Sequence, residues 1–459
     1  MNETERSRML GHMDIKKLVI KLSIPAIAAM AFNALYNLVD TFFVARGASQ
    51  IAIGALSIAY PIQMIVLAIG LMIGIGSSSI FSRAYGREDK AAMRSAVNNA
   101  VIFNLVVSII ISIIAYIFID ELLVLFGATA SNIGYARDYL SVIIFALVPF
   151  SMSIVFNNLT RAEGRPNVAM FSMIIGAVIN IILDPIFIFD WGLGLGVSGA
   201  AWATGIAKSA SFIYVFYMAM RPESSLTLHL KTIYKVNFKV IYEMIIIGLP
   251  SFVRVSLGGV LIIIVNNLIN YYATTDPAMY ISIYGVINRL MRFTLMPGFG
   301  LVQGLVPIVG FNFGAMFYER LKDAIVFTVK LLFGYFFFIF LMVLLFAEPL
   351  FGIFSPEEDA LFIAEGARAF RIIAAGFAFI TFQVLMSSVY QAMGYPIRAF
   401  IIALSRRFIL FIPFAFLLTH FMGIEGIWWT FFVADIFAGT IAFIMFLGEM
   451  KKFNRLITA

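Results

Sequence analysis

The chain contains no cysteine and only three histidines in 459 residues. The first absence excludes disulfides, thiolate metal sites and cysteine nucleophiles, and the second argues against a histidine-rich metal site. No G-x-x-x-x-G-K segment occurs, so a nucleotide-binding P-loop is missing too. Charge is scarce as well: charged residues make up 12% of the chain and hydrophobic residues 62%. A soluble domain carries about twice that charge. Most of this chain therefore belongs in a lipid bilayer.

The basic residues are spread over short loops. Lys and Arg exceed Asp and Glu by 32 to 25, giving a net charge of +7. They gather before the first apolar run and in alternate loops, which are segments 83–94, 161–165, 221–239, 320–322 and 451–455. This pattern sets membrane orientation and is not a nucleic-acid footprint. It predicts that both termini are cytoplasmic. The polar first 17 residues resemble a cytoplasmic lead-in and not a signal peptide.

Apolar runs long enough to cross a bilayer need roughly 20 residues. We expect about twelve transmembrane helices, at 17–44, 52–82, 95–120, 134–159, 167–190, 198–220, 238–272, 279–311, 323–353, 363–392, 397–421 and 426–449. The predicted fold class is therefore an all-α membrane protein.

The second half of the chain repeats the first. "LSIPAI" around Pro25 returns as "IGLPSF" around Pro250, and "GVSGAAW" returns as "GIEGIWW". "RAEGRPNVAMF" likewise returns as "QAMGYPIRAFI" at a similar offset. We therefore expect two pseudo-symmetric six-helix lobes, 1–220 and 241–459, joined by a cytoplasmic linker at 221–240. Two such lobes around a cavity are the plan of an alternating-access carrier.

Two acids lie inside predicted helices of the first half. Asp40 and Asp184 align with Val265 and Phe414 of the second half, so the repeat does not duplicate them. Counting about 1.5 Å per residue from the cytoplasmic ends places both acids in the outer half of the membrane. At the same depth we expect the remaining members of a cation or proton site, which are Asn180, Tyr139, Thr204 and Tyr36. Ionisable groups in lipid are costly and mark functional sites.

Further polar side chains share helix faces with this site. We expect a substrate cavity lined by Asn33, Asn37, Ser153, Asn157 and Met173. The methionines and phenylalanines of the chain suit a wall that accepts varied ligands. The second half instead carries basic residues in or near its spans, namely Arg254, Arg289, Arg292, Arg406 and Arg407. The role of Lys208, a cation in the first half, stays open.

Several motifs together resemble the multidrug and toxic compound extrusion (MATE) family, most closely its archaeal DinF-like branch. They are "NLVDTFFVARGA", "IGALSIAYP", "EGRPN", "INIILDPIFIF" and "GVSGAAWAT", in this order. The resemblance covers the whole chain. It implies a monomeric carrier in the cytoplasmic membrane of a prokaryote, which uses no cofactor and expels cationic or amphipathic drugs in exchange for H⁺ or Na⁺. It maps the coupling acids onto Asp40 and Asp184, and a bend of the first helix onto Pro25, where a missing backbone hydrogen bond can act as a hinge.

The coupling ion and two rival classes stay open from the sequence. Asp40 and Asp184 can hold a proton or serve as Na⁺ ligands, and the neighbouring tyrosine favours a proton. A lipid-linked precursor flippase would share the duplicated plan but needs a strongly basic cavity. An intramembrane aspartyl protease would also need two acids. It would show Gly-x-Gly-Asp, whereas Asp40 follows Val39 and Asp184 follows Leu183. We therefore expect no enzyme.

Overall fold

The computed structural model describes residues 3–47, 50–130, 132–226, 228, 236–273, 276–355 and 359–458, without the side chains of 37, 38, 41, 45, 47, 50–55 and 57. The first half forms eight helices: α1 (Glu3–His12), α2 (Ile15–Gly47), α3 (Gln50–Gly86), α4 (Lys90–Ile117), α5 (Ile119–Leu125), α6 (Ile133–Ala162), α7 (Pro166–Ile188) and α8 (Gly196–Ala219).

The second half begins with α9 inside the expected linker. Its helices are α9 (Phe238–Tyr272), α10 (Pro277–Gly314), α11 (Tyr318–Gly352), α12 (Ala360–Ala374), α13 (Phe377–Met393), α14 (Pro396–Leu404), the π-helix η1 (Ser405–Leu410), α15 (Phe411–Met422) and α16 (Glu425–Thr458). Two expected spans are thus irregular. One is α12 and α13, which meet at a bend of 48°, and the other is the run through α14, η1 and α15.

The described residues contain ten helices, or eleven with the bent pair, that are long and apolar enough to cross a membrane. The 24-residue α8 falls outside that set, but it is long enough to span and packs on α6 and α7. With α8 the structure matches the expected twelve-helix plan of an all-α, multi-pass membrane protein.

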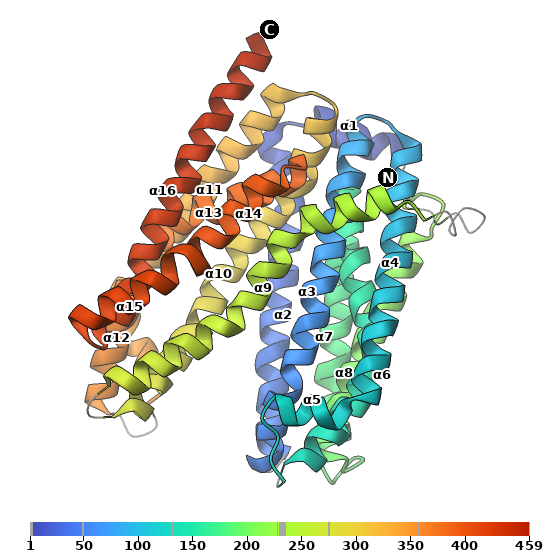
Figure 1. Cartoon of the computed structure of the whole chain (residues 1–459). Helices are drawn as coiled ribbons and strands as arrows, with labels where there is room; N and C mark the ends of the chain where they lie inside the picture. The colour runs from blue at the N-terminus through green and yellow to red at the C-terminus, as the bar shows by residue number, and fades with distance from the viewer. Residues whose placement is uncertain are drawn as a thin grey trace.

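The two halves form two bundles that meet at one end and diverge toward the other (Figure 1). Both termini lie at the end where the bundles meet. The bundles touch chiefly through two helix pairs, α2 on α10 and α3 on α9. Because α2 and α9 are equivalent in the repeat, as are α3 and α10, these two pairs repeat the same contact.

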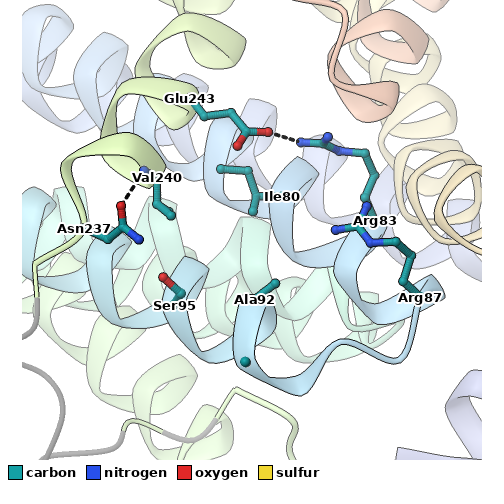
Figure 2. Close-up of a pocket in the computed structure, with 9 residues that line it drawn as sticks. Ile80, Arg83, Arg87, Ala92, Ser95, Asn237, Val240 and Glu243 are labelled. Atoms are coloured by element: carbon teal, nitrogen blue, oxygen red, sulfur yellow. Dashed lines mark hydrogen bonds and ion pairs between the residues drawn. The ribbon is translucent and has the colours of Figure 1, made fainter.

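Glycine allows backbones to touch at the crossing of α3 and α9. A Cβ at Gly76 would lie 2.0 Å from the Met244 carbonyl oxygen, and a Cβ at Gly248 would lie 1.9 Å from that of Met72. Real side chains cannot approach so closely, so each position requires glycine. At the same end, Arg83 Nη2 lies 2.9 Å from Glu243 Oε1 and links α3 to α9 (Figure 2). Contacts between backbones and one ion pair hold the lobes together here.

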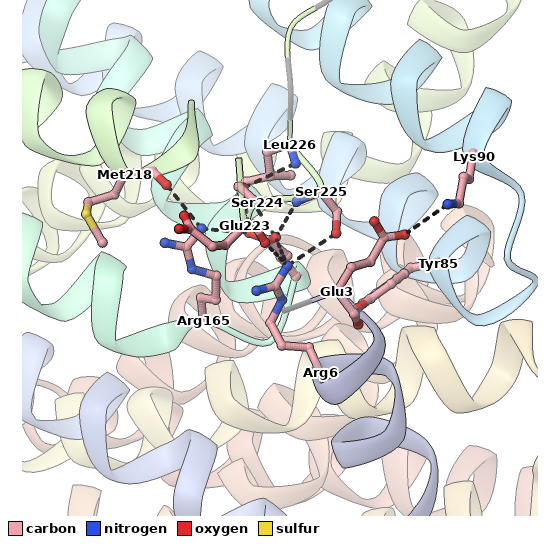
Figure 3. Close-up of polar contacts among 11 residues, drawn as sticks. Glu3, Arg6, Tyr85, Lys90, Arg165, Met218, Glu223, Ser224, Ser225 and Leu226 are labelled. Atoms are coloured by element: carbon pink, nitrogen blue, oxygen red, sulfur yellow. Dashed lines mark hydrogen bonds and ion pairs between the residues drawn. The ribbon is translucent and has the colours of Figure 1, made fainter. Parts of the chain in front are cut away.

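The short helix α1 packs across this closed end, against α3 and α10. Its Arg6 is buried and reaches the first lobe and the segment after α8, where it bonds Glu163 and the Glu223 carbonyl oxygen (Figure 3). From the second lobe, Asn312 Nδ2 and Arg320 Nη2 donate to the carbonyl oxygen of Leu10 in α1. The N-terminal helix therefore bridges both lobes.

Candidate functional site

Asp40 and Asp184 meet inside the first lobe. Asp40 comes from α2 and the fully buried Asp184 from α7, two helices that pack together. Their carboxyl groups lie within hydrogen-bonding reach of each other. Asn180, one turn before Asp184 on α7, donates from Nδ2 to Asp184 Oδ1 over 3.0 Å. The equal depth that the sequence predicts for the two acids has become direct contact.

The other predicted members surround this pair. Asn180 Nδ2 lies 3.4 Å from Thr204 Oγ1 of α8, and Tyr36 of α2 lies close to the same threonine. Tyr139 of α6 is 8% exposed and lies close enough to both acids to interact with them electrostatically. We call Asp40, Asp184, Asn180, Thr204, Tyr36 and Tyr139 the acidic cluster. Four helices thus bring all six predicted residues together.

Two further residues complete the surroundings of the acidic cluster. Gln63 of α3 donates from Nε2 to the Tyr139 hydroxyl over 3.2 Å. Sequence reasoning missed it, although a lone amide two residues after Pro61 in an apolar run was a usable signal. Lys208 turns inward, with Nζ 4.9 Å from the centre of the Tyr36 ring and within electrostatic reach of Asp40. Its ammonium can balance one negative charge of the cluster.

The free oxygen atoms of the cluster fit a small cation. Carboxylates only accept hydrogen bonds, so two of them in contact need a proton on one or a cation between them. Asp184 Oδ2 and Asn180 Oδ1 are buried without a hydrogen-bond partner among the described residues. Within that same part of the chain no group of three His, Cys, Asp or Glu residues could hold a metal ion. Na⁺ would therefore also need the amide and hydroxyl oxygens.

The residues predicted to line a substrate cavity lie elsewhere in the first lobe. Ser153 Oγ is buried 3.2 Å from Ser211 Oγ and so joins α6 to α8, whereas Asn157 Nδ2 donates to Ser153 Oγ within α6. Asn33 and Met173 are half-buried on α2 and α7, outside the lining of the cavity between the lobes. The side chain of Asn37 lies outside the described part of the structure.

A cavity of about 1020 Å³ does lie between the lobes. Apolar residues form most of its wall, including Met64 and Met291. Its volume is at the upper end of the range for sites that hold drug-sized molecules. Flexible methionines suit the adaptable wall that the sequence predicts, but these are not the predicted Met173. The charged residues of the lining are Arg161, Arg254, Arg292, Arg406, Arg407 and Asp435.

Pro25 lies where α2 touches the second lobe. A Cβ at Gly304 of α10 would meet Ser23 at 2.4 Å, and one at Gly300 would meet Ile27 at 2.7 Å. Pro25 stands between these two contacts, yet α2 runs through it without a break from Ile15 to Gly47. The structure therefore shows a continuous helix through the proline, and the hinge stays a prediction.

Relatives of known name resemble this chain over nearly its full length. The multidrug export protein MepA of Staphylococcus haemolyticus is 27% identical, over 93% of this chain and 92% of its own. The protein of that name from Staphylococcus aureus strain N315 is 26% identical, over 91% and 90% of the two chains.

Solved structures share the fold. The outward-facing conformation of a multidrug resistance MATE family transporter superposes with a TM-score of 0.89 at 24% identity, over 98% of each chain. A MOP superfamily transporter from Pyrococcus furiosus gives 0.90 at 23%, again over 98% of each. The MatE family model matches residues 25–186 and again 250–417, so that the two matches begin at Pro25 and Pro250. The chain belongs to the MatE family.

Proposed function

We propose that this protein exports drug-like, amphipathic molecules, driven by H⁺ or Na⁺ that enters through the acidic cluster. One observation carries the proposal: α2 takes part in the cluster, in the cavity and in one of the two main contacts between the lobes. Asp40 and Tyr36 of α2 belong to the cluster, and Met30 lines the cavity. Ser23 Oγ donates to the Leu301 carbonyl oxygen of α10 over 3.2 Å. A change at Asp40 can reach the lobe contact along one helix.

The cycle follows from charge in a medium of low dielectric. Two buried carboxylates repel each other, so a proton or Na⁺ that neutralises the pair lets the surrounding hydrogen bonds rearrange. A shift of α2 then changes the shape of the cavity and weakens binding of the drug. Coupling of this kind is reciprocal, so drug must weaken binding of the ion by the same factor.

The names of the relatives favour drug export over lipid flipping. We further propose a monomer in the cytoplasmic membrane of a prokaryote, with lobes at 1–220 and 241–459 and a linker at 221–240. Both termini lie at the end of the molecule that carries the basic loops, which supports a cytoplasmic location for both. The bundles then diverge toward the outside. We keep the expectation that the protein catalyses no chemical reaction and needs no cofactor.

Proteoliposomes test the proposal directly. Efflux of a fluorescent drug is followed with a pH gradient alone, with a Na⁺ gradient alone, and with neither. We expect efflux with one gradient only, and its loss in Asp40→Asn. Asp120→Asn serves as the matched control, because Asp120 pairs with Arg137 on the surface. Efflux that ignores both gradients would refute ion-coupled export.

A further inference from the structure

The charged groups of the inter-lobe cavity are almost all of one sign. Five arginines and one aspartate line it. Arg406 pairs with that aspartate, Asp435, through Nη2 and Oδ2 at 3.1 Å. No ion pair among the described residues engages Arg161, Arg254, Arg292 or Arg407. The cavity therefore carries an excess of positive charge.

Arg161 lies in the last turn of α6 in the first lobe, whereas the other four arginines lie deep in the membrane-spanning part of the second lobe. Arg254 is about 24 Å along α9 from Phe238, and Arg292 about 22 Å along α10 from Pro277, at about 1.5 Å per residue. Arg406 and Arg407 lie midway through the α14–α15 span. Unpaired cations at this depth are costly to keep and mark a substrate or ion path.

The local backbone conformation positions two of these arginines in the wall of the cavity. Arg406 and Arg407 belong to the π-helix η1, where the helix is locally wider than in α14 and α15. Consecutive residues of an α-helix point about 100° apart, yet both of these arginines line the cavity. Single π-turns in α-helices recur at functional sites. Arg407 Nη1 also donates to the Arg254 carbonyl oxygen, which fixes its position beside Arg254.

Some of the donors in the cavity are unused. Arg161 Nη1 is buried without a hydrogen-bond partner among the described residues. Arg254 donates one hydrogen bond from Nη2 to the Ser251 hydroxyl over 2.9 Å. Because each guanidinium has five N–H groups, other donors remain for a ligand. Residues of α3 with large apolar surfaces, namely Tyr60, Met64 and Ile65, also line the cavity. A cleft with one sign of charge and low-dielectric walls concentrates ions of the opposite sign.

We propose that this cavity takes amphiphiles that carry an anionic group, such as a carboxylate, sulfonate or phosphate. The anionic group lies against Arg254, Arg292 and Arg407, and the apolar body lies against α3. This proposal rests on the proposed function, because it names the substrate class of the same cavity. The sequence leads to an expectation of cationic or amphipathic substrates. This proposal keeps the amphipathic substrates and assigns them a negative charge.

Binding to the purified full chain tests the charge preference without any transport. Three probes share one ring system: pyrenebutyrate is anionic, pyrenebutanol is neutral, and pyrenebutyl-trimethylammonium is cationic. Affinity is measured by equilibrium dialysis in nanodiscs of phosphatidylcholine. We expect the anion to bind at least about tenfold tighter than the cation, since a hydrogen bond to a charged group contributes about that factor. Equal or tighter binding of the cation would overturn the proposal.

Variants assign the effect to the arginines. Arg292→Gln and Arg407→Gln should each weaken pyrenebutyrate about tenfold and leave pyrenebutanol unchanged. Arg292→Glu should reverse the preference toward the cation, which a purely structural role would not do. Arg289→Gln is the matched control, three residues earlier on α10 and exposed outside the cavity. Unchanged pyrenebutyrate affinity in both Gln variants would remove the arginines from the site.

A last arm separates lipid from soluble ligand. Adding phosphatidylglycerol to the nanodiscs should weaken pyrenebutyrate if an anionic lipid headgroup enters the cavity, and should change nothing if only soluble amphiphiles do. Either result supports an anionic ligand and identifies its source. Failure of gradient-driven efflux with intact preference for the anion would refute the export function alone. Efflux with preference for the cation would refute this inference alone.

Discussion

Arg6 and Glu163 form an ion pair with an Nη2–Oε1 distance of 2.7 Å, and both side chains are almost completely buried. Glu163 directly follows the last residue of α6, and it also accepts hydrogen bonds from the Ser224 hydroxyl and the Ser225 backbone N–H. One carboxylate therefore ties α1, α6 and the segment after α8 together at the closed end of the molecule.

Breaking this pair should be costly. We expect Arg6→Ala to lower the free energy of unfolding by up to about 3–5 kcal/mol, because the buried Glu163 carboxylate then keeps only Arg165, at 3.4 Å, as a cation. Thermal unfolding of the detergent-solubilised protein measures this loss. Arg137→Ala removes the exposed Arg137–Asp120 pair and should cost less than about 1 kcal/mol. Similar losses in both variants would mean that Arg6 contributes little beyond a surface contact.

The acidic cluster should be needed for transport and not for folding. Asp40→Asn and Asp184→Asn each remove one of two like charges, so we expect normal amounts of folded protein and no gradient-driven efflux. Efflux in proteoliposomes and the elution profile in size-exclusion chromatography measure the two properties. Normal efflux by either folded variant would remove that acid from the mechanism.

The coupling ion should decide how drug release depends on the medium. If the pair of acids takes a proton, lowering external pH should displace bound drug, and Asp40→Asn should shift or abolish that response. If it takes Na⁺, millimolar Na⁺ should displace drug at constant pH and K⁺ should do so poorly. Drug binding measured across a pH series and a Na⁺ series separates the two, and a response to neither would contradict both.

Pro25 and Pro250 occupy equivalent places but should not matter equally. Only α2 carries an acid of the cluster beyond its proline, since the repeat places Val265 in α9 where α2 has Asp40. We expect Pro25→Ala to slow transport more than it weakens drug binding, and Pro250→Ala to do less. Transport rates and binding affinities of the two variants are compared. Equal losses would indicate a shared packing role.

The glycines at the crossing of α3 and α9 should tolerate no side chain. We expect Gly76→Leu and Gly248→Leu to cost about 1–3 kcal/mol of stability and to abolish transport, because the new side chain must displace a backbone carbonyl. Gly334→Ala in α11 meets open space and should leave both properties intact. Melting temperature and efflux rate provide the test, and wild-type behaviour of both leucine variants would contradict it.

Hydropathy and the repeat were sufficient to predict the lobes, and helix depth was sufficient to bring Asp40 to Asp184. The helix face that Ser153 shares with Tyr139 packs on α8 inside the first lobe, where Ser153 bonds Ser211 and does not line the cavity between the lobes, because spacing along a helix does not specify which neighbour its face meets. The bend between α12 and α13 and the π-helix η1 depend on packing, which leaves no local signal. The arginines were visible in the sequence, but only the fold shows that Arg254 and Arg407 share one wall.

Gly76 and Gly248 also make the crossing of α3 and α9 suitable as a pivot between the lobes. At these two glycines the backbones meet directly, so a tilt about this point moves no side chain of Gly76 or Gly248. The crossing lies far from the open end, because Gly76 is about 39 Å along α3 from Gln50. A tilt of about 10° at the glycines would then carry the far end of the helix by about 7 Å, as a lever does. A small tilt at the glycines therefore becomes a displacement of several ångströms at the open end of the cavity.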